Sequence, residues 1–423
     1  MTSPTVSLDS HTLLRQIQLL GEIGDQGPGA GRTRIALTDE EKAGRDLLVT
    51  WMEDLGLSVR IDQIGNIFGI LESKTEAGNQ HPLMIGSHID SVRHAGALDG
   101  CYGVLAGLAI ARAYRAAAIV PERAIVIAAF TNEEGVRYQP DMMGSLVYAG
   151  GLAVEDALNT IGTDGSRLGE ELQRIGYAGE MEPGAIQPFE YLELHIEQGP
   201  VLQAEGKAIG VVEHLQGISW QKISIQGTAN HAGTTPTRLR HDAGYVAAAI
   251  TSFVREQVVG AHPDSTLATV GSISFEPNLI NVIANKATLT LDLRDPDELR
   301  LQEAEQKVRL FIEQISRQEG VTITVEPLVR FQPVAFDALL ADEIEQAATE
   351  LGLSSLRMTS GAGHDAQMIA RIAPAAMIFV PSEQGISHNP REHTDDQQLI
   401  QGAEVLLRVV QQRLQAAPIA LTR

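Results

Sequence analysis

The chain has 423 residues, of which 43% are hydrophobic and 20% are charged, as is typical of a folded protein with more than one domain. Its 32 Lys and Arg residues against 54 Asp and Glu residues give a net charge of −22, which disfavours binding to nucleic acid or to an anionic membrane surface. The single cysteine, Cys101, excludes an intramolecular disulfide and fits a reducing compartment. No apolar run approaches the about 18 residues of a membrane span, and residues 1–11 lack a signal-peptide pattern, so we expect a soluble, cytoplasmic protein.

In chain order, the first segment that bears on chemistry is the apolar run at residues 83–86, which predicts a short buried strand. His88 follows its carboxyl end, and Asp90 could accept a hydrogen bond from the second ring nitrogen, as the partner of a metal-bound histidine does. Asp99 comes directly before a predicted helix at residues 102–118. A carboxylate in that position, taken alone, is more often a helix cap than a ligand.

Residues 124–130 are all apolar and predict a strand that is buried on both faces, as in a parallel sheet covered by helices. Glu133 and Glu134 follow its carboxyl end, where ligands bind in open α/β sheets. Because neighbouring side chains on an extended backbone point to opposite sides, one Glu could bind a metal while the other faces a substrate. The alternative for such a pair is a solvated acidic turn.

Residues 191–199 alternate between apolar and polar side chains, which predicts a strand with one polar face. His195 lies on that face, and its alternative interpretation is a surface residue on a half-exposed strand. Together, His88, Asp99 and Glu134 form a set of nitrogen and oxygen ligands at successive strand ends. In that company, His195 becomes a further candidate ligand.

The pattern changes near residue 215. Four alternating strands and two amphipathic helices predict an α+β layer with helices on one face of a mainly antiparallel sheet. The strands are expected at residues 218–227, 266–275, 286–294 and 321–329, and the helices at 242–259 and 296–319. A last buried strand at 375–380 returns the chain to the first fold. We therefore expect a catalytic domain at residues 1–215 and 331–423, interrupted by an inserted domain at 216–330.

Seven motifs, in order over nearly the whole chain, resemble those of the metal-dependent amidohydrolases that include N-carbamoyl-L-amino acid hydrolases, allantoate amidohydrolases and β-ureidopropionases. These enzymes belong to the two-metal superfamily of aminoacylases and related carboxypeptidases. The chain departs from them at residues 213–216, where a smaller, less charged turn is expected. The motifs are His88-x-Asp90, Ala97-Leu-Asp-Gly100, Thr131-Asn-Glu-Glu-Gly135, Glu193-Leu-His-Ile-Glu-Gln-Gly199, Asn230-His-Ala-Gly-Thr-Thr-Pro236, Ser360-Gly-Ala-Gly-His-Asp365 and Gly385-Ile-Ser-His-Asn389.

The resemblance implies an α/β fold: a mixed-sheet, two-metal peptidase-like catalytic domain with an inserted α+β domain that serves as lid and dimer interface. It implies two divalent ions per subunit, bridged by Asp99, with five ligands: His88, Asp99, Glu134, His195 and His388. Imidazole and carboxylate ligands without thiolate suit zinc and also manganese, cobalt or nickel. Glu133 is then the general base, which takes a proton from the attacking water and returns it to the leaving nitrogen.

The resemblance further implies that the carbamoyl C–N bond of an N-carbamoyl-L-amino acid is hydrolysed, with release of ammonia, carbon dioxide and the amino acid. Allantoate, ureidoglycolate and β-ureidopropionate remain alternatives, because each has a ureido group and a carboxylate. The planar fork of Arg294 suits a substrate carboxylate, and its alternative is an ion pair with Asp292 or Asp295. The other substrate contacts that the resemblance implies are Gln198, His231, Asn281 and Gly361. A plain loop position is the alternative for His231.

Two hypotheses from other classes stay open. A relative that hydrolyses peptides or N-acyl amino acids is disfavoured by His195, because a carboxylate usually occupies that ligand position in those enzymes. A binding protein that had lost catalysis would be expected to lack Glu133 or one of the ligands, and all of them are present.

Overall fold

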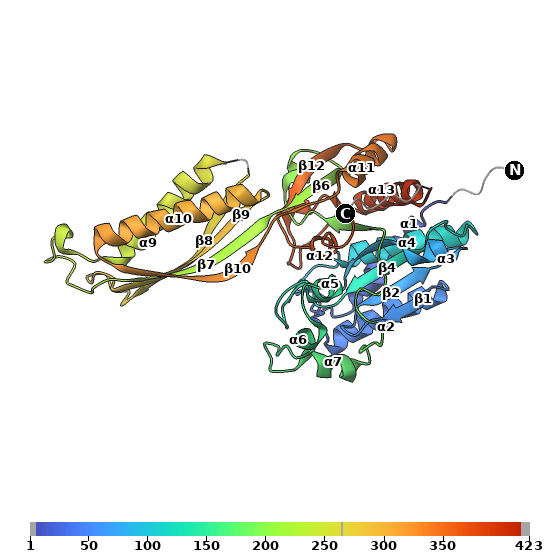
Figure 1. The fold of residues 1–423 in the computed structure, drawn as a ribbon, viewed down its shortest axis with the longest axis horizontal. Coiled ribbons are helices and arrows are strands. Elements are labelled where there is room, and N and C mark those ends of the chain that lie inside the picture. The colour runs from blue at the N-terminus through green and yellow to red at the C-terminus, as the bar shows by residue number, and fades with distance from the viewer. Residues whose placement is uncertain (1–5, 264, 416–423) are drawn as a thin grey trace. The chain divides into compact units, whose positions relative to one another are not determined.

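The computed structural model describes residues 6–263 and 265–415. The chain forms two compact units: residues up to Glu213 with residues from Phe336 onwards form unit 1, and His214–Ala335 form unit 2 (Figure 1). The boundaries expected from the sequence lay at residues 215 and 330. No helix among the described residues is long and apolar enough to cross a membrane.

A mixed sheet in the order β1-β2-β4-β3-β5-β13-β6-β11, with β12 paired to β6, forms the centre of unit 1, except that β11 and the last two residues of β6 belong to unit 2. The four central strands, β4, β3, β5 and β13, are parallel, whereas β1–β2, β2–β4, β13–β6 and β6–β11 are antiparallel pairs. Their carboxyl ends therefore meet at one edge of the sheet. The strands are β1 (Ser58–Ile61), β2 (Ile67–Leu71), β3 (Leu83–His88), β4 (Ile125–Phe130), β5 (Glu190–Ile196), β6 (Ile209–Leu215), β11 (Val334–Ala335), β12 (Ser355–Ser360) and β13 (Ala375–Val380).

Helices cover both faces of this sheet. On one face Gly107 lets α4 approach Ile85 and Ile127 closely, and on the other Tyr148 of α5 packs against Phe68 with ring centroids 5.4 Å apart. The sheet is therefore buried on both sides, as an α/β layer requires. The helices are α1 (Ser10–Glu22), α2 (Asp39–Asp54), α3 (Glu76–Gln80), α4 (Cys101–Ala116), α5 (Met143–Tyr148), α6 (Val154–Leu158), α7 (Leu168–Ile175), α8 (Val201–Ala204), α11 (Ala338–Glu350), α12 (Asp365–Ile369) and α13 (Asp396–Gln415).

Strand β4 confirms the strand predicted at residues 124–130, because every residue of β4 is buried. Strand β5 corrects the prediction at 191–199. Its expected polar face is as buried as its apolar face, with Glu193 and His195 only 0% and 1% exposed. The amino end of α12 packs on this face, where the Ala366 N–H donates to Glu193. The surface interpretation of His195 is therefore wrong.

Two strands of unit 1, β6 and β12, have no counterpart among the predicted elements. Residues 213–216, where the resemblance implied a small turn, instead include the end of β6. Glu213 accepts a hydrogen bond there from Arg357 Nη1 at 2.9 Å. The charged residue that departs from the family pattern is thus held by an ion pair on the neighbouring strand.

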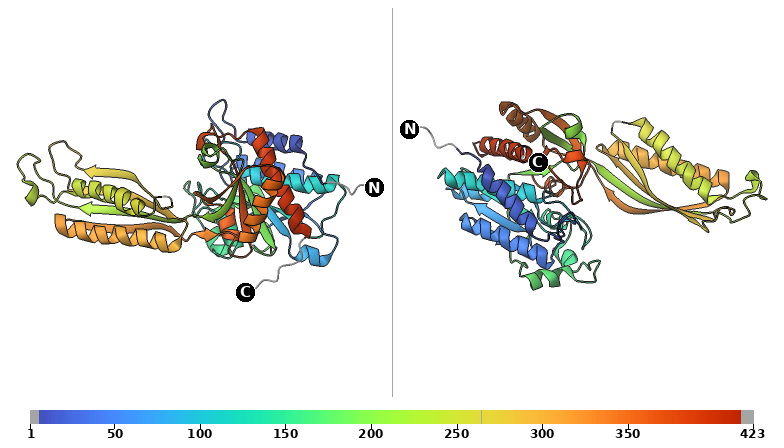
Figure 2. Two further views of the ribbon diagram at one scale, coloured as in Figure 1. Left: turned by 90° about the horizontal axis from the view of Figure 1, so that it is seen from above. Right: turned by 180° about the vertical axis from the view of Figure 1, so that it is seen from behind.

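Unit 2 is a four-stranded antiparallel sheet in the order β10-β7-β9-β8, with helices on one face (Figure 2). Leu289, Leu291 and Leu293 of β9 pack against these helices, while Arg294 and its alternate neighbours face the other way. The elements are β7 (Gly217–Gln226), α9 (Ala243–Phe253), β8 (Leu267–Glu276), β9 (Lys286–Asp295), α10 (Glu298–Glu319) and β10 (Thr322–Phe331). This is the α+β layer that the sequence predicts.

Candidate metal and substrate site

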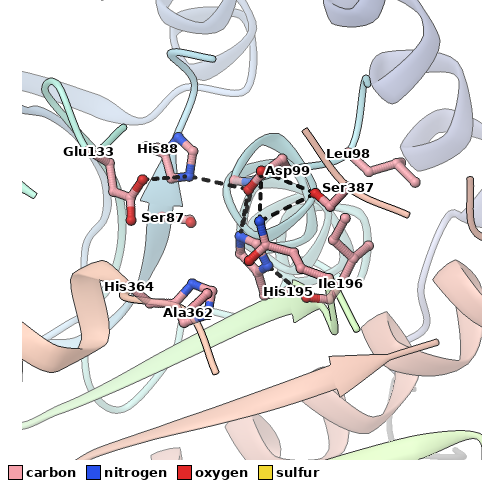
Figure 3. A network of polar contacts seen from close by, with 12 residues as sticks. Ser87, His88, Leu98, Asp99, Glu133, His195, Ile196, Ala362, His364 and Ser387 are labelled. Carbon is pink, nitrogen blue, oxygen red and sulfur yellow. Dashed lines mark hydrogen bonds and ion pairs between the residues drawn. The ribbon is translucent and has the colours of Figure 1, made fainter. Parts of the chain in front are cut away.

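Three histidines of unit 1 converge on the carboxylate of Asp99, which lies just before α4. Figure 3 shows two of them, His88 and His195. The Nε2 atoms of His88 and His195 lie 3.6 Å and 3.2 Å from its Oδ1 atom. His388 Nε2 approaches the other oxygen, Oδ2, at 3.0 Å. One carboxylate thus faces two groups of donors through its two oxygens.

Those donors form two groups. Within each group, the ligand atoms all lie within 4.8 Å of one another. The first consists of His88, Asp99 and His195, and the second of Asp99, Glu134 and His388. Because Asp99 belongs to both, the arrangement suits two cations that share one carboxylate. The structure therefore brings together all five residues that the sequence proposes as ligands.

The tautomers of the two buried histidines leave the correct nitrogen free for a metal. His88 Nδ1–H donates to the Asp90 carbonyl at 3.0 Å, and His195 Nδ1–H donates to the Ile196 carbonyl at 2.8 Å. A carbonyl accepts only from a protonated nitrogen, so each Nδ1 carries a proton, and each Nε2, which faces Asp99, is the nitrogen left to bind a metal. The donor set therefore fits a divalent ion.

Asp90 has a different role from the one expected. Its backbone carbonyl, not its carboxylate, accepts the His88 hydrogen bond, and the carboxylate lies 3.7 Å from that nitrogen. The carboxylate instead accepts the backbone N–H groups of Glu133 at 3.2 Å and Glu134 at 3.3 Å. Asp90 thereby fixes the turn after β4, and the two Glu side chains diverge: Glu133 Oε2 lies 3.4 Å from His88 Nε2, and Glu134 Oε2 lies 3.4 Å from His388 Nε2.

The electrostatics of these groups favour cations. Burial raises the pKa of Glu133 well above its usual range, and burial together with the charge of Asp99 raises the pKa of Glu134 to about 8. Burial also opposes ionisation of Asp99, but hydrogen bonds from the three histidines outweigh it and hold the pKa of Asp99 well below its usual value. The hydrogen bond to Asp99 raises the pKa of His388 to about 9. Carboxylates crowded in this way are stabilised by positive charge between them.

The site opens on one side only. The side chains of His88 and His195 are 2% and 1% exposed, whereas that of His388 is 49% exposed. A cavity of about 150 Å³ lies on this open side, within unit 1. Its lining residues are Asp99, Glu133, Glu134, Asp141, Gln198, Ala362, Gly363, His364 and His388. A reacting group in this cavity would meet both the ligand cluster and Glu133.

Of the residues predicted to contact substrate, Gln198 lies at this cavity. Its Nε2 donates to Asp99 Oδ2 at 2.8 Å and to Ser387 Oγ at 3.3 Å. Gln198 and His388 both adopt positive φ angles, 57° and 52°, a conformation that side chains other than Gly rarely take and that clusters at functional sites. Gly361, which was predicted to contact substrate, is exposed and is not among the residues that line the cavity. Its neighbours Ala362 and Gly363 do line it.

The other predicted substrate residues lie in unit 2. Arg294 donates to both oxygens of Asp292, with its Nη2 2.9 Å from Oδ2. Arg294 therefore forms the ion pair that the sequence offered as the alternative to substrate binding. His231 is exposed, and its Nδ1 accepts the Gly233 N–H at 3.0 Å. Asn281 lies beside it, because the Asn281 carbonyl accepts the Ala232 N–H at 2.9 Å.

His231 and Asn281 are remote from Arg294 within this unit. The bridge between His231 and Val282 lies beyond Lys286, the first residue of β9, whereas Arg294 is near its last. Eight residue steps at about 3.4 Å each separate Lys286 from Arg294 by about 27 Å along the strand. One copy of unit 2 therefore presents these predicted contacts at two opposite ends of its sheet.

Comparison with known proteins identifies the family. The profile described as "Peptidase family M20/M25/M40" matches residues 84–412. The chain belongs to peptidase family M20/M25/M40. It is therefore a hydrolase that acts on C–N bonds.

Two relatives and one solved structure extend this result for the M20/M25/M40 chain. It is 38% identical to an N-carbamoyl-L-amino-acid amidohydrolase of Rhizobium meliloti, over 92% of this chain and 94% of that protein. It is 33% identical to an allantoate amidohydrolase of Bacillus subtilis, over 94% of this chain and 96% of that one. The crystal structure of an amidase of the hydantoinase/carbamoylase family from Burkholderia multivorans superimposes with a TM-score of 0.93 at 38% identity, covering 98% of this chain and 100% of that one.

Sequence reasoning missed several residues of this M20/M25/M40 site. His364 and Asp141 line the cavity, and burial lowers the pKa of His364 well below its usual value, so its imidazole is neutral. Glu193 lies within reach of His195 and His364, and its place two residues before His195 on one strand was the available signal. The hydrogen-bond partners of Glu193, Ser87 and Ala366, come from distant segments, and no local sequence pattern reveals them.

A larger cavity of about 660 Å³ lies at the opposite, amino ends of the central strands. It is lined by residues that directly precede those strands, among them His81, Arg123, Phe189 and Pro374. None of the metal-ligand groups found among the described residues lies there. Candidate metal ligands therefore border the small cavity and not the large one.

Proposed function

We propose that the protein is a metal-dependent amidohydrolase that cleaves the carbamoyl C–N bond of an N-carbamoyl-L-amino acid, releasing ammonia, carbon dioxide and the amino acid. The observation that carries this proposal is the carboxylate of Asp99, shared by two groups of nitrogen and oxygen donors next to Glu133. The name of the Rhizobium meliloti relative supports the carbamoyl substrate. Allantoate is the second candidate, supported by the Bacillus subtilis relative.

His88, Asp99 and His195 would hold one divalent ion, and Asp99, Glu134 and His388 the other. Two ions held in this way would supply Lewis-acid chemistry, polarising a carbonyl and lowering the pKa of water towards about 7. Zn²⁺ is the first choice for these ligands, and Mn²⁺, Co²⁺ or Ni²⁺ have the same ligand preferences.

Glu133 is the general base in this proposal. It lines the cavity but belongs to neither group of metal ligands, so its carboxylate is available for proton transfer. Asp90 fixes its backbone N–H, which keeps the carboxylate beside the open face of the site. Glu133 takes the proton from the attacking water and later gives it to the leaving nitrogen.

The substrate carboxylate is assigned to Arg294, whose planar guanidinium binds carboxylates with two parallel hydrogen bonds. Its ion pair with Asp292 is the alternative to this assignment, so a substrate carboxylate would have to displace Asp292. Gln198, His231, Asn281 and the backbone at Gly361 are assigned to the carbamoyl group. Together they recognise a small molecule that carries both a ureido group and a carboxylate.

We further propose that the protein is a homodimer formed through unit 2. Strand β8 is an edge strand of the sheet, and Leu267, Ile273 and Phe275 on it are exposed. A long edge strand with exposed apolar side chains is normally covered by another chain. A second copy would also bring His231 and Asn281 of one subunit to the Arg294 end of the other. The sole cysteine, Cys101, is buried and free, which supports a reducing, cytoplasmic location.

The deciding experiment is a screen of ammonia release. Protein stripped with EDTA is supplied with Zn²⁺, Mn²⁺, Co²⁺ or Ni²⁺ and tested on N-carbamoyl amino acids, allantoate, ureidoglycolate and β-ureidopropionate, with N-acetyl amino acids as the acyl control. We expect no activity without metal, restored activity with at least one ion, and highest kcat/KM for an N-carbamoyl-L-amino acid. Full activity of metal-free protein, checked by elemental analysis, contradicts the metal proposal. A preference for N-acetyl amino acids contradicts the substrate.

A further inference from the structure

Two of the proposed ligands, His88 and His388, are each preceded by a serine whose hydroxyl donates to a glutamate. Ser87 Oγ donates to Glu193 Oε1 at 2.7 Å. Ser387 Oγ donates to Glu392 Oε2 at 2.8 Å. The two pairs come from separate parts of the chain and from opposite sides of Asp99, so each half of the site has a Ser–Glu contact of its own.

Glu193 joins three elements beneath the first half of the site. Its side chain is completely buried, and besides Ser87 of β3 it accepts Tyr191 OH of β5 at 3.0 Å and the Ala366 N–H of α12 at 2.8 Å through Oε2. Glu193 lies near His195, but both of its oxygens are engaged in hydrogen bonds. These hydrogen bonds make Glu193 a support for the strands that carry His88 and His195.

Glu392 joins different segments beneath the second half. Its Oε1 accepts the backbone N–H groups of Leu98 at 2.9 Å and Asp99 at 3.3 Å, while Oε2 accepts Ser387. The carboxylate therefore ties the backbone of the shared ligand Asp99 to the segment that carries His388. That segment lies outside any strand, and His388 has a positive φ angle, so its position depends on such contacts.

We propose that Glu193 and Glu392 are positioning residues that divide the site between them: Glu193 orients the ligands His88 and His195, and Glu392 orients His388 against Asp99. The inference rests on the proposed two-ion function. Its physical basis is that groups behind the ligands fix ligand orientation, and losing one typically weakens metal binding about 10- to 100-fold. Each glutamate should then have its larger effect on the ion whose histidine ligands it orients, and the effect of Glu392 on the other ion, through the backbone of the shared ligand Asp99, should be smaller.

The test uses full-length protein with only one half of the site intact. His388→Ala leaves the half with His88 and His195, and His195→Ala leaves the half with Glu134 and His388. Ser87→Ala or Ser387→Ala is added to each background, and the metal-free proteins are titrated with Co²⁺, followed by visible absorption. These serine variants remove one donor to a carboxylate oxygen and keep the glutamate with its other hydrogen bonds, so they are milder than removal of a glutamate.

We expect Ser87→Ala to weaken Co²⁺ binding about 10-fold or more in the His388→Ala protein, where Ser387→Ala changes it less than about 3-fold. The pattern should reverse in the His195→Ala protein. Glu193→Ala and Glu392→Ala should follow the same pattern more strongly. Glu193→Gln should retain most of the affinity, because its amide oxygen can accept from Tyr191 and Ala366 while its nitrogen donates to Ser87.

Tyr102→Phe is the control for a buried hydroxyl, because Tyr102 OH donates to the Leu399 carbonyl away from the ligands. It should lower the melting temperature without changing Co²⁺ affinity. Equal weakening of both halves by each serine variant, or by neither, overturns the inference. Wild-type protein that binds two Co²⁺ ions but releases no ammonia contradicts the proposed function alone, whereas protein that binds no Co²⁺ overturns both.

Discussion

The candidate site residues of unit 1 converge, whereas those of unit 2 are far apart. In unit 1, His88, His195 and His388 all approach one carboxylate within 3.6 Å. In unit 2, Arg294 and the pair of His231 and Asn281 occupy opposite ends of β9, about 27 Å apart along the strand. Unit 1 alone can therefore assemble a metal site, but one copy of unit 2 cannot bring all its predicted contacts to one small substrate.

The difference follows from strand direction. Parallel strands place all their carboxyl ends at one edge, so residues that follow β3 and β4 meet there although some 40 residues separate them. In an antiparallel sheet, neighbouring strands run in opposite directions, so the carboxyl end of β7 lies beside the amino end of β9. The loop that carries His231 and the end of β9 that carries Arg294 thus fall on opposite sides.

The largest expected effect lies in unit 1. Glu133→Gln keeps the shape of the side chain but cannot accept a proton. We expect kcat to fall about 10²- to 10⁴-fold, which is the factor that general acid–base catalysis typically contributes. The variant should still bind both ions and substrate, because Glu133 belongs to neither ligand group. Steady-state kinetics and elemental analysis on the same preparation measure both quantities.

Its control is the chemically identical neighbour. Glu134→Gln removes a charged ligand, so metal content should fall and added metal should restore part of the rate. If Glu133→Gln loses metal while Glu134→Gln keeps both ions and only turns over slowly, the roles of the two residues are reversed.

Much of the unit 1 site could be predicted because its residues follow recognisable strands. His88 and Glu134 lie just at or after apolar runs, and His195 lies on a strand with clear alternation. The burial of the polar face of β5 could not be predicted, because it depends on α12, which follows some 170 residues later. His388 has no strand before it to indicate its place, and only the resemblance assigned it.

The supporting groups were beyond sequence reasoning for the same reason. Glu392 contacts Asp99 across 293 positions of sequence, and Glu193 contacts Ala366 across 173. Local periodicity carries no information about such partners. The separation of Arg294 from His231 likewise depends on the antiparallel pairing of β7 with β9, which the predicted elements did not include.

A smaller effect is expected for Arg294 in unit 2. Arg294→Lys keeps the charge but loses the two parallel hydrogen bonds to a carboxylate, so kcat/KM should fall about 10- to 100-fold, the equivalent of about 1.5–3 kcal/mol for a hydrogen bond to a charged group. The loss should appear mainly in KM, because the substrate carboxylate is bound alike in ground and transition states. Metal content should not change.

Arg300→Lys is the matched control, because Arg300 is also a partly exposed Arg of unit 2 that pairs with an aspartate, Asp295. It should leave KM within about twofold of wild type, because lysine keeps a positive charge beside the buried Asp295, which also accepts a hydrogen bond from Thr266 Oγ1. If Arg300→Lys lowers kcat/KM as much as Arg294→Lys does, the loss reflects a change in the stability of unit 2 and not a change in substrate binding.

The last prediction tests whether two copies share one site. His231→Ala and Arg294→Ala should each be nearly inactive, yet co-expression in equal amounts should recover about one quarter of wild-type activity. The reason is symmetry: about half of the dimers are mixed, and each mixed dimer has one intact site, with Arg294 from one subunit and His231 from the other. Co-expressed His231→Ala and Asn281→Ala should recover nothing, because these residues lie at the same end of unit 2 and no mixed dimer supplies both from one subunit. Differently tagged subunits allow mixed dimers to be purified and assayed directly. If they form but stay inactive, Arg294 and His231 do not complete one site from two copies.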